Sequence, residues 1–405
     1  MRYRFVVICV ISLPLFGQSS GGQPPSAVQS MLMQQASGVS TNPAAAPMPM
    51  LMFSQRDWTL MLHGNGFLVQ TVENGPRGGD KLFSANWVMG SAERHLYGGE
   101  LLLRSMLSLE PATIGKSGYP EPFQTGEGLI DRQHAHDFFM ELAAEWAIDV
   151  DGTIGYIYAA PVGDPALGPV AFPHRASAIE MPQAPLGHHL GDSTHIAGSV
   201  VTIGGKRGMY GLAFSGFHGR EPDNSNRWDI DRGAIDSWAL RGTWDPSQNI
   251  SAQVSTGHLK APEANEPGDI QRTTASIAYA TAALASTAIA GWNHRSGNDS
   301  AGITLESSLL FNESNYLTGR LEFLRKEELA HPVKALTAGY TKDLYRTASL
   351  VGGAGANVTA SWSGSDRPIS VFAFVRVRTR AMSSMPKMEM PMTKPMTMPM
   401  PHSMQ

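Results

Sequence analysis

The 405-residue sequence has very little cysteine, few charged residues and no long hydrophobic run. Its single cysteine, Cys9, lies close to the start, so the rest of the chain has no disulfide, no thiolate metal site and no cysteine nucleophile. Only 16% of the residues are charged and the formal net charge is −4, which gives no basic stripe for a nucleic acid. No segment has about 18 consecutive apolar residues, so a transmembrane helix is not expected.

The first residues have the pattern of an export signal. Arg2 and Arg4 give a positive start, residues 5–16 are mostly apolar, and residues 17–21 are mostly small, as a cleavage site requires. We predict a cleavable signal peptide over residues 1–22. A membrane anchor is the weaker interpretation, since a spanning helix needs about 20 apolar residues. An exported chain without such a helix is periplasmic, secreted or an outer-membrane barrel.

Two segments have a biased composition rich in methionine and proline. Residues 23–54 are polar, contain proline and alanine, and include Met31, Met33, Met48, Met50 and Met52. We predict that they form a disordered periplasmic linker. Residues 381–405 alternate methionine with proline, and proline at that density prevents helix and strand alike. We predict a disordered tail there.

Between these segments the sequence alternates between apolar and polar residues with the period of two that marks β-strands. In the last such stretch Val371, Val375 and Val377 fall on one face, while Phe372 and Arg376 fall on the other. A strand with arginine on one face and aliphatic residues on the other fits a wall with lipid outside and a wet lumen inside. A soluble β-sandwich or β-helix is the alternative.

Connection lengths support the barrel. The alternating segments predict about 16 strands, to within two. Short connections, such as 150–152, then alternate strictly with long ones, such as 111–136 and 162–194. Outer-membrane barrels of Gram-negative bacteria have short periplasmic turns and long extracellular loops. We therefore predict an all-β, antiparallel transmembrane barrel over residues 55–380, with both termini in the periplasm.

The polar faces of the predicted strands carry charged side chains that would face the lumen. As pore-lining residues they would select small polar solutes, whereas as ion pairs they would close the lumen, and the sequence does not separate the two. The set comprises Arg104, Glu141, Glu145, Arg241, Glu306, Arg320, Glu322, Arg376 and Arg378.

Histidines gather in the predicted outward loops. Two clusters stand out, one with His134 and His136 and the other with His188, His189 and His195. Imidazoles two residues apart in an extended chain point the same way and could share a metal ion, with carboxylates completing or orienting the site. The alternative is a structural hydrogen-bond network that ties the loops into the barrel mouth, because spacing alone does not define a metal site.

The methionine-rich tail suggests a second kind of metal ligand, because thioether sulfur is a soft donor that prefers Cu(I) to hard ions. The candidate ligands are Met388, Met390, Met392, Met396, Met398, Met400 and His402. The alternative is low-complexity sequence without a ligand.

An enzyme is not expected. Some outer-membrane barrels are hydrolases, and Ser193 lies near Asp192 and His195. However, residues adjacent in sequence rarely form a triad, and the sequence has no Gly-x-Ser-x-Gly nucleophile elbow.

Three stretches, 131–142, 163–175 and 188–195, resemble an uncharacterised family of bacterial outer-membrane β-barrels whose members often occur beside heavy-metal efflux systems. The resemblance covers most of residues 55–380, although members often have proline in place of Ala135. It implies a metal efflux system as a partner, whereas outer-membrane lipid and the barrel assembly machinery are expected from the barrel pattern itself. Three functions remain open: a porin-like barrel of copper or heavy-metal homeostasis, a general solute porin with structural histidines, and an outer-membrane hydrolase.

Overall fold

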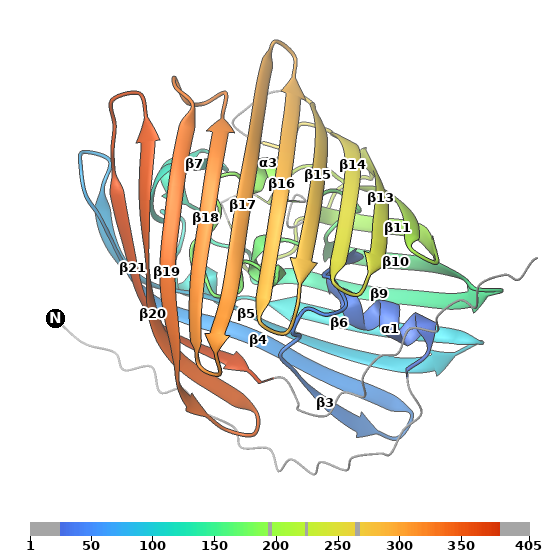
Figure 1. Cartoon of the computed structure of the whole chain (residues 1–405). Helices are drawn as coiled ribbons and strands as arrows, with labels where there is room; N and C mark the ends of the chain where they lie inside the picture. The colour runs from blue at the N-terminus through green and yellow to red at the C-terminus, as the bar shows by residue number, and fades with distance from the viewer. Residues whose placement is uncertain (1–24, 193–196, 223–225, 264–267, 381–405) are drawn as a thin grey trace, which may run out of the picture.

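The computed structural model describes residues 25–192, 197–222, 226–263 and 268–380. Sixteen long antiparallel strands close into a barrel in these residues (Figure 1), which confirms the predicted fold and strand number. They are β4(Trp58–Glu73), β5(Gly79–Leu96), β6(Gly99–Leu107), β9(Phe139–Val150), β10(Thr153–Gly163), β11(Ala197–Arg207), β12(Tyr210–His218), β13(Ser237–Ser247), β14(Ile250–Leu259), β15(Ile270–Ala280), β16(Leu284–Arg295), β17(Asn298–Asn312), β18(Asn315–Arg325), β19(Val333–Arg346), β20(Leu350–Ser363) and β21(Ile369–Thr379).

The last strand and a short N-terminal strand share one edge of β4. Strand β21 pairs with β4 from Asn65 to Glu73, and β3(Met50–Gln55) pairs with the remaining part of β4, from Trp58 to His63. At the junction the hydroxyl of Thr379 donates to the carbonyl oxygen of Pro49. Strand β3 therefore continues the line of β21 and completes the wall where β21 ends.

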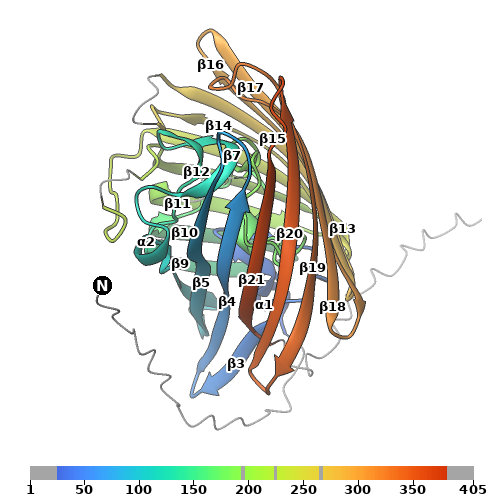
Figure 2. The ribbon, with the colours of Figure 1, turned by 90° about the vertical axis from the view of Figure 1, so that its left-hand side faces the viewer.

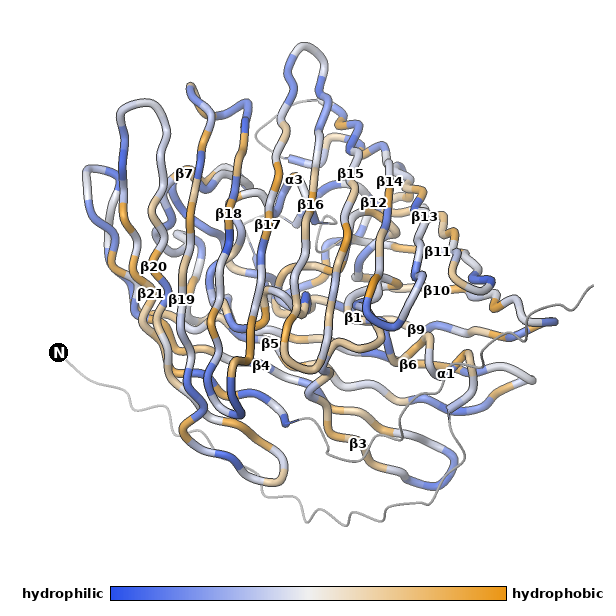
Figure 3. The backbone as a smooth tube through the Cα atoms, viewed as in Figure 1, coloured by the Kyte–Doolittle hydropathy of each residue, from blue (hydrophilic) through white to orange (hydrophobic). Residues whose placement is uncertain are grey.

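The two faces of the wall differ as the alternation predicted. In β21, Val375 and Val377 are each 52% exposed on the outside, whereas Phe372 and Arg376 are at most 1% exposed on the inside. Figure 3 shows the same alternation of hydropathy along the other wall strands. The outer face is thus the apolar surface that a lipid bilayer requires. Among the described residues, no helix is long and apolar enough to cross a membrane.

The two ends of the barrel differ in their connections. At one end, here called the turn end, neighbouring strands are joined by two or three residues, as at 151–152 and 281–283. At the other, the loop end, connections reach the length of 108–138 and 164–196. One expectation was wrong: the alternation is not strict, because β16 and β17 continue beyond their neighbours and close at the loop end with a tight turn at Gly297, whose φ is +91°.

The predicted disordered linker is wrong for residues 25–54, which fold inside and along the barrel. The helix α1(Ala27–Gln34) is capped reciprocally by Ser26 and Gln29. Its buried side chains, including Leu32, pack with wall residues such as Leu102. We call residues 25–49 the N-terminal plug. Composition alone missed it because its stability comes from contacts with the wall.

The plug continues from α1 into a small hairpin of β1(Gln35–Ser37) and β2(Ser40–Thr41). Gly38 turns the hairpin with a φ of +49°, and a Cβ there would lie 2.5 Å from the carbonyl oxygen of Asp164. Only glycine allows the hairpin this close to the loop that descends from the other end.

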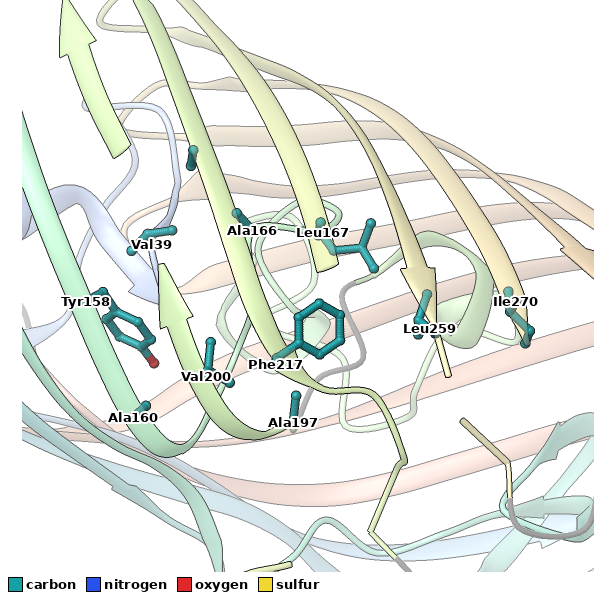
Figure 4. Close-up of a cluster of buried hydrophobic side chains, with 12 residues drawn as sticks. Val39, Tyr158, Ala160, Ala166, Leu167, Ala197, Val200, Phe217, Leu259 and Ile270 are labelled. Atoms are coloured by element: carbon teal, nitrogen blue, oxygen red, sulfur yellow. The ribbon is translucent and has the colours of Figure 1, made fainter. Parts of the chain in front are cut away.

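That descending loop lies inside the barrel wall (Figure 1). Residues 164–192, the loop plug, contain a 3-10 turn, η1(Phe172–His174), and the short helix α3(His188–Gly191). Figure 1 shows α3 inside the wall. In loop 108–138, β7(Tyr119–Gly126) pairs with β8(Leu129–Gln133) and packs against β4 and β5. The short helix α2(Glu110–Thr113) of the same loop, labelled in Figure 2, packs against β5. The two plugs meet: Val39 and Leu167 belong to one buried cluster with Phe217 and Leu259 of the wall (Figure 4).

Candidate metal centre

Four segments bring imidazoles and carboxylates together at the loop end. They are loop 108–138, the loop plug, and the connections after β12 and after β14. Helix α3 lies tightly against the wall because it ends in glycine: a Cβ at Gly191 would lie 2.9 Å from the Cγ2 of Ile289. The side chains that converge are Glu127, His134, His188, His189, Glu221 and Glu263.

The three histidines form a compact group. One ring nitrogen from each of His134, His188 and His189 lies within 4.8 Å of the others. The Nε2 atoms of His134 and His189 are only 3.1 Å apart. Two imidazole nitrogens at this distance share one proton in a hydrogen bond, or they share a metal ion after a small displacement.

Backbone carbonyls orient two of these rings. The Nδ1 of His134 lies 3.0 Å from the carbonyl oxygen of Ala135, and the Nδ1 of His188 lies 2.9 Å from that of Pro185. Because a carbonyl oxygen only accepts, each Nδ1 carries the proton and each Nε2 carries a lone pair. Metal-binding histidines are commonly oriented in this way, with the second nitrogen donating to a carbonyl or carboxylate.

Carboxylates surround the histidines. The Nδ1 of His189 lies 3.6 Å from Glu221 and 3.9 Å from Glu263. The Nδ1 of His134 lies 3.4 Å from Glu127. The group therefore offers nitrogen and oxygen donors at short range, which is the set that divalent ions such as Zn²⁺ and Cu²⁺ accept.

The electrostatics of the group reflect its burial. Burial opposes the charged form of His189, but Glu221, Glu263 and Glu127 outweigh it and hold the pKa of His189 above its usual value. Burial likewise favours neutral Glu221, yet His189 lowers its pKa below the usual value. Burial raises the pKa of Glu127 to about 8, although Arg227 opposes that shift. The carboxylates therefore compensate a positive charge at His189, the place that a cation would take.

Arg227 closes one side of the group. It forms ion pairs with Glu127 and with Asp137, the latter at 2.9 Å, and it is 4% exposed. Arg227 thus engages Glu127 and leaves Glu221 and Glu263 as the carboxylates nearest to His189. We therefore expect those two to complete a metal site.

The remaining predicted histidine ligands lie elsewhere. The Nδ1 of His136 lies 2.8 Å from Glu110, and its ring centroid is 6.3 Å from that of His134. His136 thus pairs with a carboxylate in place of joining the group. His195 lies outside the described residues, as do Ser193, the signal peptide at 1–22 and the tail at 381–405 with Met388, Met390, Met392, Met396, Met398, Met400 and His402.

The nine charged residues predicted to line a pore all face the interior, and eight of them contact one of the plugs. Arg104 and Arg241 donate to carbonyl oxygens of Gly38 and Val39. Six more wall residues contact plug residues: Glu145 contacts Gln35, Glu306 contacts Arg175, Arg320 contacts Gln183, Glu322 contacts Gly187, and Arg376 and Arg378 contact Glu180. The ninth residue, Glu141, pairs with Arg104 of the wall. These residues fasten the plugs to the wall.

Sequence reasoning missed the carboxylate half of the site. Glu221 and Glu263 lie in separate loops with no histidine motif beside them, and only the barrel brings them to His189. It also left His63 and His174 without a role. His63 closely follows Met61 in the sequence, and His174 lies within the stretch 163–175 that carries the family resemblance.

Comparisons with known proteins show the fold. No protein-family model matches the chain, and no curated protein matches it. Among solved structures, the anion-selective porin from Comamonas acidovorans has a TM-score of 0.52 at 10% identity, covering 79% of this chain and 99% of the porin. Salmonella typhi OmpF, in complex with daunomycin, has a TM-score of 0.52 at 10% identity, covering 80% and 100%. The chain therefore has the fold of a sixteen-stranded porin.

Proposed function

We propose that this protein is a porin-like barrel of the bacterial outer membrane that binds a transition-metal ion at its loop end and serves metal homeostasis. The observation that carries the proposal is the group of His134, His188 and His189, with Glu221 and Glu263 beside it. A buried group of three imidazoles is costly unless it is hydrogen-bonded or metal-bound. Here Nδ1 of His134 and Nδ1 of His188 each contact a backbone carbonyl, which is the orientation common among metal-binding histidines.

The proposed orientation follows from the connections. Short turns are periplasmic and long loops extracellular in outer-membrane barrels. The histidine group then meets ions that arrive from outside the cell, and both chain termini lie in the periplasm. Export by a signal peptide at 1–22 and insertion by the barrel assembly machinery are parts of the same proposal.

Copper is the metal that we favour. A site of imidazole and carboxylate ligands binds Cu²⁺ more tightly than other divalent first-row ions. The tail at 381–405 supplies thioethers suited to Cu(I) on the periplasmic side. A heavy-metal efflux system is the partner that such a tail would serve.

A general solute porin is the alternative. It needs a water-filled lumen, whereas Arg104, Arg241 and Arg376 bind plug residues. We expect low single-channel conductance in planar bilayers with and without metal. Large constant conductance would favour the general porin. The hydrolase alternative has less support, because Asp192 is bound to Arg175 at 2.6 Å and is 1% exposed.

Zinc titration of the refolded full-length barrel tests the loop-end site, because thioethers bind Zn²⁺ poorly and the tail therefore contributes little. We expect one tight site, weakened at least about tenfold by His188→Gln/His189→Gln. The control is His294→Gln/His331→Gln, which removes two exposed histidines outside the group. Equal affinity of all three proteins would make the histidine group a structural network.

Deletion of residues 381–405 tests the copper tail. Cu(I) affinity is measured in competition with a calibrated chelator, with and without the tail. A loss of sites on deletion assigns Cu(I) capture to the tail. Unchanged binding would refute the tail's role.

A further inference from the structure

A second cluster of metal-binding side chains lies deeper in the lumen, toward the turn end. A cavity of about 40 Å³ separates the N-terminal plug from the wall. Five methionines line it: Met33, Met48 and Met50 from the N-terminal segment, and Met61 and Met89 from β4 and β5. Within the described part of the chain no carboxylate lines this cavity, and its charged residue Arg104 is paired with Glu141 at 3.2 Å.

Two histidines face the same cavity with nitrogens that lack hydrogen-bond partners among the described residues. Both ring nitrogens of His174 and the Nε2 of His63 are buried and unpaired. His174 is 4% exposed. The indole of Trp87 contacts both rings, with centroid distances of 4.6 Å to His63 and 4.2 Å to His174. These aromatic contacts hold the imidazoles in place without satisfying their nitrogens.

Methionine alone would not indicate a ligand, because its flexible side chain is common in apolar cores. The unpaired histidines change the interpretation, since burying a polar nitrogen without a partner is costly. Thioether sulfur and neutral imidazole nitrogen are both ligands of soft and borderline metals, whereas hard ions require oxygen. The absence of carboxylate from the lining disfavours divalent cations and favours a single positive charge.

We propose that the cavity between Met50, Met61, Met89, His63 and His174 binds one soft monovalent metal ion, Cu(I) or Ag(I). This site is separate from the histidine group at the loop end, and neither proposal depends on the other. Its ligands come from three separate parts of the chain: Met50 belongs to the N-terminal strand β3, Met61 to wall strand β4 and His174 to the loop plug. A bound ion therefore joins the loop plug to β3 and to the wall, and stabilises the folded arrangement of these segments.

The test uses the full-length chain with its tail methionines replaced by leucine, so that the tail adds no thioether sites. Cu(I) is titrated under reducing conditions against a calibrated chelator, and X-ray absorption reports the ligand atoms. Met50→Leu/Met61→Leu removes two sulfurs at nearly constant volume. Met181→Leu/Met209→Leu is the matched control, since neither of these methionines lines the cavity.

We expect one Cu(I) per chain with both sulfur and nitrogen neighbours, and at least tenfold weaker binding in Met50→Leu/Met61→Leu. His174→Gln should remove a nitrogen neighbour from the absorption spectrum, and the control should match the parent. Absence of Cu(I) binding in the tail-substituted parent, or equal affinity in Met50→Leu/Met61→Leu, would overturn the proposal. His188→Gln/His189→Gln separates the two sites, because it should weaken Zn²⁺ and leave Cu(I) binding unchanged.

Discussion

The two segments inside the barrel are held by different means. The loop plug is held by buried ion pairs: Arg175 lies 2.5 Å from Glu306 of the wall and 2.6 Å from Asp192 of the plug itself. In the N-terminal plug, helix α1 is held by packing, with Leu32 buried among wall residues such as Met61. The same alternating wall thus presents charge where a polar loop descends and apolar side chains where a helix lies.

The difference extends to the proposed metal sites. Carboxylates accompany His189 at the loop end, whereas thioethers accompany His174 deeper in the barrel. Harder donors thus lie nearer the loop end and softer donors nearer the turn end. A single barrel can in this way offer different ions different places, and the comparison can be tested one plug at a time.

The largest expected effect comes from the ion pairs of the loop plug. Arg175→Ala leaves Asp192 and Glu306 buried without their main cation, and breaking a buried pair costs about 3–5 kcal/mol. We expect a lower free energy of unfolding in urea and faster proteolysis within 164–192. Lys260→Ala is the control, since its partner Asp269 is a surface contact. Equal stability of the two variants would mean that packing, not charge, holds the loop plug.

The corresponding change in the N-terminal plug is Leu32→Ala. Leu32 is 3% exposed, and truncating a buried leucine costs about 2–5 kcal/mol. We expect the cost at the lower end, because the neighbouring methionines can adjust to the space. Urea titration measures it, with Gln34→Ala as the control at the end of the same helix. A loss as large as that of Arg175→Ala would remove the contrast between the two plugs.

A smaller effect depends on pH where the plugs meet. Burial, together with Glu141, raises the pKa of Asp164 to about 8. Asp164 therefore stabilises the fold fully below its unfolded pKa, and this contribution is lost as pH rises through about 8. Stability of the wild type should fall between pH 7 and 8 by up to about 1.4 kcal/mol more than that of Asp164→Asn. Parallel pH profiles would show that Asp164 is ionised throughout.

The smallest effect concerns the cap of α1. Ser26 accepts from the backbone N–H of Gln29 at 3.1 Å, and removing such a cap costs about 1 kcal/mol. Ser26→Ala should lower the stability of the plug slightly without changing Zn²⁺ binding. Ser26→Asp, which keeps an acceptor, should retain the wild-type value. An effect on Zn²⁺ affinity would mean that the two plugs are coupled.

The wall could be predicted from sequence because its signal is local. Val375 faces lipid and Arg376 faces the interior, so each strand records both environments in consecutive residues. The N-terminal plug could not be predicted from sequence, because its capping box of Ser26 and Gln29 lies inside a segment whose proline and alanine suggest disorder. The histidine half of the loop-end site was visible as His134, His188 and His189. Glu221 was not, because its place depends on how the loops fold.

Strand β3 has a consequence for assembly. The edge of β4 is covered in two parts, by β21 from Asn65 to Glu73 and by β3 from Trp58 to His63. Strand β21 is the last strand of the wall and β3 the first strand of the sheet. The edge of β4 is therefore fully paired only when both of these strands are in place. The N-terminal segment is therefore needed to complete the closure of the barrel. A barrel that lacks it would retain an open edge on β4 that can pair with another chain.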